Sequence, residues 1–168
     1  MTVSAAADEA AQAGSVKGQT APGLAATAER PTLVLDTNIL LDVWVFGDAA
    51  AAPLISGLPQ GQWRWLATPP MREELARVLA YPQIVKSLAH HQINPQTVLD
   101  QFDAHAEMVA VAAKASVTCK DPDDQKFIDL AVAHHATLLS KDQAVLCMAK
   151  RLLALGVRAG AAIHLIAP

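Results

Sequence analysis

The sequence predicts an α/β domain in which a mostly parallel β-sheet is covered by helices on both faces. One reason is that short runs of β-forming residues alternate with helical segments from residue 31 onward. Another is that Ala, Leu and Val supply most of the apolar content while aromatic residues make up only 4%, which is typical of Ala-rich helices on a sheet. With 168 residues, 52% of them hydrophobic and 17% charged, we expect one globular domain with a sizeable core.

The first 30 residues differ in composition from the rest of the chain. They are mostly Ala, Gly, Ser, Thr and Gln, with almost no large apolar side chains. Such a segment cannot bury enough surface to offset the conformational entropy that it would lose on ordering. We therefore expect residues 1–30 to form a flexible N-terminal tail and residues 31–168 to form the folded domain.

The order of the expected elements indicates where a ligand would bind. Strands are expected at 32–36, 63–67, 137–140 and 162–166, with a weaker candidate at 108–112. Helices are expected at 37–46, 49–57, 69–80, 82–91, 95–107, 122–135 and 143–155. Ligands of parallel sheets bind outside the carboxyl ends of the strands, where the strand order reverses. Acidic residues that follow strands or begin helices are therefore the candidate site residues.

The net charge and the absence of targeting patterns limit the classes of protein to which this sequence can belong. The formal net charge is −3, whereas proteins that hold nucleic acid by general electrostatic attraction are usually basic. Either the chain does not bind nucleic acid, or its acids gather in one place and a metal neutralises them. No apolar run reaches the ~20 residues of a membrane span, and the N-terminus lacks the pattern of a signal peptide. Cys119 and Cys147 have no metal-ligand spacing, so we expect a cytoplasmic protein with reduced thiols.

Two candidate acids each follow a predicted strand. Asp36 ends the run LVLD, and Asp142 follows the run TLLSK. Carboxylates at the carboxyl ends of parallel strands are placed to hold a metal ion at the top of the sheet. Asp also suits the N-cap of a following helix, so position alone leaves both interpretations open.

Two further acids lie on predicted helices, where the helical repeat predicts their direction. At 100° per residue, Glu74 lies at the edge of the apolar stripe of its helix, and Glu73 faces the opposite side. Asp124 lies on the apolar stripe of its own helix, which Asp121 is expected to cap ahead of Pro122. The alternatives are that Glu74 is a boundary residue that reaches solvent and that Asp124 stabilises the helix dipole.

The joint arrangement of these acids points to a metal site. Clustered carboxylates repel one another and raise each other's pKa values unless a cation is present. Hard divalent ions such as Mg²⁺ bind through a few carboxylates together with water and substrate phosphates. Such an ion would bridge an acidic site to an acidic substrate, lower the pKa of a bound water and stabilise charge on a leaving oxygen.

These motifs resemble a known family. LVLDTN, the helix that carries Glu74-Leu75, DPDDQKFIDLA and LLSKD occur in the order found in the PIN domain superfamily, and they are similar to the toxin components of bacterial toxin–antitoxin pairs. The resemblance covers about residues 31–168. It implies a three-layer α/β/α sandwich with a sheet of four to five strands, a Mg²⁺ or Mn²⁺ site, and hydrolysis of RNA phosphodiester bonds. The tail lies outside the family pattern and receives no role.

The resemblance also assigns roles to residues. It implies the catalytic quartet Asp36, Glu74, Asp124 and Asp142. Three of these, Asp36, Asp124 and Asp142, would hold the metal, while Glu74 completes the site or orients the attacking water. The polar supports that would bond ligands or phosphate are Thr37, Asn38 and Ser140, the last of which is Thr in many relatives. Lys141 is interpreted as a solvated surface lysine rather than a phosphate contact.

The partners follow from the resemblance and from one apolar segment. Type II toxins of this kind act on RNA, tend to form homodimers and are inhibited by a small antitoxin protein. Residues 39–46 are too apolar to face solvent on any side, which fits either an interface or a fully buried helix. The alternative function is a PIN-like module that binds RNA or protein without cutting.

Other candidate chemistries are weaker. The pairs His90-His91 and His134-His135 lack metal-ligand spacing and are expected on helix surfaces. Trp63 and Trp65 share one face of a strand, which favours core positions over base-stacking platforms. The sequence contains no Gly-rich phosphate loop and no GxSxG nucleophile motif.

Overall fold

A five-stranded parallel sheet forms the centre of the computed structural model, which describes residues 29–163. The strand order is β3-β2-β1-β4-β5. The strands are β1 (Thr32–Leu35), β2 (Arg64–Ala67), β3 (Glu107–Met108), β4 (Thr137–Leu139) and β5 (Ala159–Gly160). Every adjacent pair is parallel, so all carboxyl ends meet at one edge of the sheet. The predicted tail, apart from Glu29 and Arg30, lies outside the described residues.

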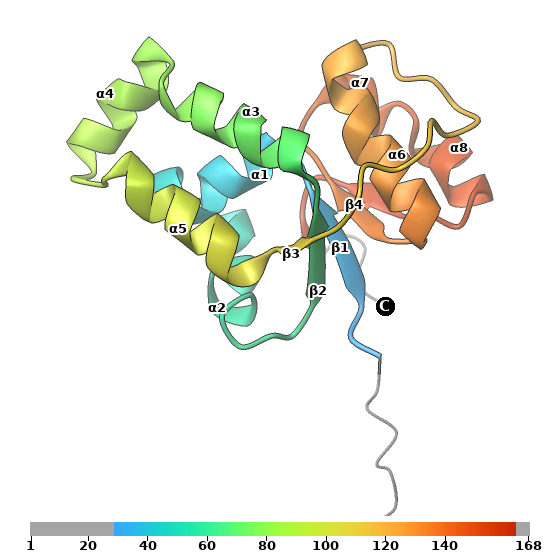
Figure 1. Cartoon of the computed structure of the whole chain (residues 1–168), viewed down its shortest axis with the longest axis horizontal. Helices are drawn as coiled ribbons and strands as arrows, with labels where there is room; N and C mark the ends of the chain where they lie inside the picture. The colour runs from blue at the N-terminus through green and yellow to red at the C-terminus, as the bar shows by residue number, and fades with distance from the viewer. Residues whose placement is uncertain (1–28, 164–168) are drawn as a thin grey trace, which may run out of the picture.

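Helices cover the sheet on both sides, as the fold class predicted (Figure 1). The first side carries α1 (Thr37–Leu41), a π-helix η1 (Asp42–Phe46), a 3₁₀ turn η2 (Ala49–Ala51), α2 (Ala52–Gly57), α3 (Pro69–Leu79), α4 (Pro82–His90) and α5 (Pro95–His105). The second side carries a 3₁₀ turn η3 (Pro122–Asp124), α6 (Gln125–His134), α7 (Gln143–Leu146) and α8 (Ala149–Ala154). The chain therefore folds as a three-layer α/β/α sandwich.

The hydrophobic core lies on both faces of the sheet around its central strand, β1. The side chains of Leu33, Val34 and Leu35 in β1 are at most 2% exposed, as expected for a parallel strand buried on both faces. Helix α6 packs on β1 and β4 from the second side. On the first side Trp65 contacts the rings of Trp44 and Phe102, with centroid distances of 5.7 and 4.9 Å. The core interpretation of Trp65 is therefore confirmed.

The apolar segment after β1 is part of this core. Trp44 is half-buried and Phe46 is 41% exposed, while the other apolar residues of the segment are buried: Ile39, Leu40, Leu41, Val43 and Val45. The segment therefore packs mainly into the core of its own chain, and its last residue reaches the surface. No single helix among residues 29–163 is long and apolar enough to cross a membrane; Thr37–Phe46 and Ala49–Gly57 pass that test only as a pair, across a 105° bend.

Three predicted elements differ from the structure, and backbone pairing between strands accounts for two of them. The last strand among residues 29–163 is Ala159–Gly160, because Leu138 N donates to Arg158 O and Ser140 N donates to Gly160 O. It therefore precedes the predicted 162–166, of which only residues 162 and 163 are described. Strand β3 is limited to Glu107–Met108 because its partner β2 ends at Ala67. The predicted helix 143–155 breaks between Leu146 and Ala149.

Candidate active site

The strand order reverses at β1, and the acidic residues gather there. The chain runs from β1 outward to β2 and β3 and then returns to place β4 and β5 on the other side of β1. The carboxyl ends of β1 and β4 are therefore adjacent, with Leu35 opposite Leu139. Asp36 and Ser140 follow these two residues. This is the position at which open parallel sheets bind ligands.

Asp36 is buried and held by the neighbouring strand end. Its side chain is 4% exposed, and Oδ2 accepts a hydrogen bond from Ser140 Oγ at 2.6 Å. Asp36 N donates to Leu139 O at 2.9 Å, which fixes the backbone beside β4. Burial raises the pKa of Asp36, the hydrogen bond from Ser140 opposes that shift, and repulsion by Glu74 adds to it. Its side chain makes no full N-cap hydrogen bond to α1 within the described residues, but the backbone N–H groups of Asn38 and Thr37 lower its pKa, so its position remains compatible with a capping role.

Glu74 reaches the site from α3. Its Oε1 accepts a hydrogen bond from Thr37 Oγ1 at 2.7 Å, and its Oε2 pairs with Lys126 Nζ of α6. The side chain of Glu74 is 13% exposed, whereas Glu73 is an exposed residue. The helix phase predicted for α3 is therefore confirmed, and α3 and α6 meet through one ion pair although they belong to opposite layers.

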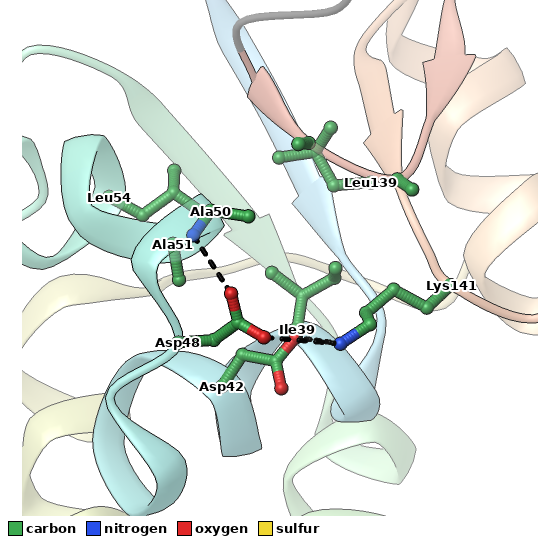
Figure 2. A pocket seen from close by; sticks show the side chains of 10 residues that line it. Ile39, Asp42, Asp48, Ala50, Ala51, Leu54, Leu139 and Lys141 are labelled. Carbon is green, nitrogen blue, oxygen red and sulfur yellow. Dashed lines mark hydrogen bonds and ion pairs between the residues drawn. The ribbon is translucent and has the colours of Figure 1, made fainter.

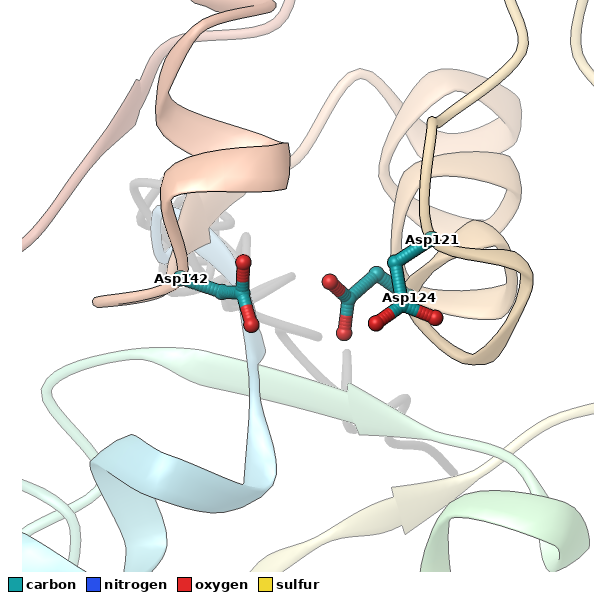
Figure 3. Close-up of side chains that lie close together, drawn as sticks. All are labelled: Asp121, Asp124 and Asp142. Carbon is teal, nitrogen blue, oxygen red and sulfur yellow. The ribbon is translucent and has the colours of Figure 1, made fainter.

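Three aspartates form the cluster that can hold a metal ion (Figure 3). One carboxylate oxygen from each of Asp121, Asp124 and Asp142 lies within 4.8 Å of the other two. Asp121 and Asp124 come from the start of the α6 segment, and Asp142 faces them from the end of β4. Asp36 lies outside this 4.8 Å group, although its charge acts on Asp124.

Asp124 is the most perturbed member of the cluster. The residue is 8% exposed, and burial is the largest cause that raises its pKa to about 7. Repulsion by Asp36, Asp142, Asp121 and Glu74 raises it further, in that order. Its Oδ2 is buried without a hydrogen-bond partner in the part of the chain that the structure describes.

These observations fit a hard divalent cation. Buried polar atoms are almost always paired, so an unpaired carboxylate oxygen among like charges calls for a positive ligand. The donor set consists of carboxylate oxygens, which Mg²⁺ and Mn²⁺ prefer over the nitrogen and sulfur ligands typical of zinc. Asp124, Asp142 and Asp121 would hold such an ion, and the nearby Asp36 would add charge.

Two of these aspartates also cap helices. Asp142 Oδ1 accepts a hydrogen bond from Ala144 N at 2.7 Å, and Asp121 Oδ1 accepts one from Asp123 N at 2.9 Å. The capping interpretation of Asp142 is therefore realised together with its place in the cluster. Each cap uses one carboxylate oxygen and fixes the direction of the other.

The three predicted polar supports bond to the protein framework. Ser140 is fully buried; besides its bond to Asp36, its Oγ accepts a hydrogen bond from Asp142 N at 3.1 Å. Thr37 holds Glu74, as described above. Asn38 Oδ1 accepts a hydrogen bond from Lys141 N at 3.2 Å, which ties α1 to the end of β4. Thr37 and Ser140 thus fix the orientation of acids predicted for the site.

Two residues of this site, Asp121 and Lys126, were not predicted from the sequence as site residues. Asp121 was interpreted only as a cap, although the spacing of three residues to Asp124 would have placed both on one helix face. Lys126 was not singled out, because one lysine on an amphipathic helix carries no signal that separates it from a solvated one. The histidine pairs are exposed, as expected, and the aspartate cluster contains no histidine.

A second group of acids lies beside a separate pocket of about 270 Å³ (Figure 2). Its lining is largely apolar and includes Ile39, Leu54 and Leu139. Lys141 Nζ lies 2.7 Å from Asp42 Oδ2 and 3.7 Å from Asp48 Oδ2. Asp42 raises the pKa of Lys141 through this hydrogen bond. The lysine is 45% exposed but paired, so its charge is neutralised within this pocket.

Comparison with protein families identifies the chain. A family model described as the PIN domain matches residues 32–144, which is more than half of the sequence. The chain belongs to the PIN domain family. This agrees with the resemblance drawn from LVLDTN, DPDDQKFIDLA and LLSKD.

A solved structure shares the fold of this chain. A crystal structure of VapBC2 from Rickettsia felis, bound to a DNA fragment from its promoter, contains a chain that matches with a TM-score of 0.52 and 16% sequence identity. The match covers 77% of this chain and 98% of that one. A PilT N-terminus domain protein from Sulfolobus solfataricus P2 matches with a TM-score of 0.41 and 15% identity, covering 77% of this chain and 85% of that one. A search of curated proteins found no match.

Proposed function

We propose that this protein is a divalent-metal-dependent endoribonuclease that hydrolyses RNA phosphodiester bonds. The observation that carries the proposal is Asp124: its Oδ2 is buried without a partner within the described residues, and burial, together with repulsion by nearby carboxylates, raises its pKa to about 7. A carboxylate kept in such surroundings makes physical sense as a cation ligand. The PIN domain family supplies the substrate class.

The residues divide into ligands and positioning groups. Asp124, Asp142, Asp121 and Asp36 provide the negative charge that would hold Mg²⁺ or Mn²⁺. When bound, such an ion lowers the pKa of water and stabilises charge on the leaving oxygen. Ser140 fixes the direction of Asp36.

Glu74 is held by two partners and has the geometry of an orienting group. Thr37 donates to one of its oxygens, and Lys126 pairs with the other. A carboxylate fixed in this way can accept a hydrogen bond from the attacking water and orient it toward phosphorus. An open recess of about 430 Å³, lined by Lys120, Asp121, Pro122 and Ala144, adjoins the cluster, and we propose that RNA approaches from this side.

The deciding experiment compares metals and includes a matched control. Single-stranded RNA is incubated with the protein in Mg²⁺, Mn²⁺ or EDTA, alongside Asp124→Asn and the exposed Glu73→Gln. We expect cutting by the wild type and Glu73→Gln only when a divalent ion is present, and no cutting by Asp124→Asn. Equal cutting in all three conditions would exclude the metal mechanism. No cutting by the wild type in any condition would favour the alternative, a PIN-like module that binds RNA or protein without catalysis.

The biological role that we propose is the toxin of a type II toxin–antitoxin pair acting in the cytoplasm. It is supported by the sequence resemblance to toxin components and by the fold shared with a chain of the Rickettsia felis VapBC2 structure. Expression of the protein should arrest bacterial growth, and a small protein encoded beside it should relieve the arrest. Arrest that persists with Asp124→Asn would separate toxicity from RNA cutting.

A homodimer is proposed on the family resemblance alone. The apolar segment 39–46 no longer supports it, because that segment is almost entirely buried within one chain. Light scattering at tens of micromolar should give the mass of two chains. A monomer at that concentration would contradict the dimer without affecting the nuclease proposal.

A further inference from the structure

Lys126 brings a fixed positive charge into the acidic site. It lies in the first turn of α6, two residues after Asp124. Its Nζ pairs with Glu74 Oε2, donates to Asp123 O, and lies 4.9 Å from the centroid of the Phe127 ring. The side chain is 22% exposed, about half the exposure of Lys141. Three contacts on a mostly covered side chain hold this ammonium group against Glu74.

The charge of Lys126 has a clear role in the metal-free protein. A buried carboxylate without a countercharge strongly disfavours the folded state, and Glu74 is 13% exposed. Lys126 supplies that countercharge through its ion pair with Glu74. It must also repel any divalent cation that approaches the same carboxylates, because like charges a few ångströms apart interact strongly in a partly buried site.

We propose that Lys126 is a resident cation of this site, which competes with the divalent ion for the acidic residues and supplies one positive charge to the RNA phosphate. The proposal rests on the proposed function and names a residue that would contact its substrate. The chain carries a net charge of −3, so a local cation beside the cluster compensates for repulsion of RNA. When the charge of Lys126 is removed, the first role predicts tighter binding of the divalent ion and the second predicts weaker binding of RNA.

The first measurement is a calorimetric titration of the RNA-free protein with Mn²⁺. Lys126→Met should bind Mn²⁺ about tenfold more tightly than the wild type, since a repulsive charge is removed. Lys126→Arg keeps the charge and should behave like the wild type. Lys141→Met removes a lysine paired with Asp42 and Asp48 outside the aspartate cluster, and it should change Mn²⁺ affinity by no more than about twofold.

The second measurement is binding of a non-cleavable phosphorothioate RNA in saturating Mn²⁺ over a salt series. Lys126→Met should bind about fivefold more weakly, and the slope of log affinity against log salt should fall by about one, the signature of one lost phosphate contact. A lysine that only stabilises the fold would leave this slope unchanged. Lys126→Arg should restore both the affinity and the slope.

The outcomes separate this proposal from the nuclease proposal. If Lys126→Met binds Mn²⁺ no more tightly than Lys141→Met does, or if the RNA salt slope does not change, the resident-cation role is wrong. If Lys126→Met does not fold by circular dichroism, Lys126→Gln, which removes the charge but keeps a hydrogen-bond donor, takes its place in both measurements. Failure of the wild type to cut RNA would refute the nuclease function, while the Mn²⁺ titration would still test Lys126.

Discussion

Asp42 and Asp124 are equally buried but differ in their partners. Each is 8% exposed. Asp42 Oδ2 lies 2.7 Å from Lys141 Nζ, whereas Asp124 Oδ2 has no hydrogen-bond partner within the described residues and faces other carboxylates. The pKa of Asp124 rises to about 7 as a result of burial and this repulsion.

The difference shows that the partners of a buried carboxylate, rather than its burial alone, indicate its role. Beside the pocket, Lys141 balances the charge of Asp42, so this pair needs no ligand from outside the protein. A buried aspartate among like charges has no countercharge until a cation binds. Without that cation, the repulsion between the carboxylates lowers the stability of the folded protein. Perturbed groups of this kind concentrate at functional sites, and the predictions below test that distinction.

The largest expected effect is on the turnover of RNA, and it should separate Asp124→Asn from Asp42→Asn. Asp124→Asn should lower the rate of RNA hydrolysis by about a thousandfold or more, because it removes a charge that would hold the metal. Asp42→Asn should leave the rate within about threefold. Initial rates at saturating Mn²⁺ measure both. Similar losses from the two variants would mean that the two groups of acids form one functional unit.

The next effect distinguishes two adjacent glutamates of α3. Glu74→Gln should lower turnover by on the order of ten- to a thousandfold, since it weakens a positioned group that accepts from Thr37 and pairs with Lys126. Glu73→Gln changes an exposed residue and should stay within a factor of about two. Circular dichroism first checks that both variants fold. Loss of activity in Glu73→Gln alone would require the site to be redrawn.

The sequence predicted the fold and most of the site because those features depend on local pattern. Alternating strands and helices imply a parallel sheet, and the helical repeat was enough to turn Glu74 inward and Glu73 outward. The placement of Asp36 after β1 and Asp142 after β4 followed from the same rule for parallel sheets.

What the sequence did not predict depends on pairing between distant segments. The last strand forms at Ala159–Gly160 because backbone partners on β4 and on the residue after it are available there, although residues 162–166 are more apolar. Similarly, the role of Lys126 depends on α3 and α6 meeting across the end of β1, and the pairing of Lys141 with Asp42 spans 99 residues. The spacing of residues along a single helix or strand does not predict contacts of this kind.

A smaller effect concerns how stability depends on pH without metal. The pKa of Asp124 is raised in the folded protein to about 7, above the ordinary value of 3.8, so the folded state binds this proton more tightly than the unfolded state. Its contribution to stability is therefore present at low pH and lost as pH rises from about 4 to about 7. In EDTA, the melting temperature of Asp124→Asn should exceed that of the wild type by an amount that grows over this range and then levels off, reaching a few degrees.

Mn²⁺ at neutral pH checks this interpretation. The ion should raise the melting temperature of the wild type and leave that of Asp124→Asn nearly unchanged, because only the wild type keeps the carboxylate ligand. A difference between the two proteins that does not vary with pH would show that Asp124 does not titrate in the expected range.

The smallest effect is on stability, where Asp→Asn should have opposite signs at positions 124 and 42. In metal-free buffer near pH 7, Asp124→Asn relieves repulsion and should stabilise the fold, whereas Asp42→Asn removes the main partner of Lys141 and should destabilise it. Because Lys141 is 45% exposed, solvent screening limits that loss to about 1 kcal/mol in the free energy of unfolding. Urea denaturation measures both. If both variants are destabilised by similar amounts, Asp124 is compensated in the metal-free protein after all, and equal burial would then imply equal roles for the two aspartates.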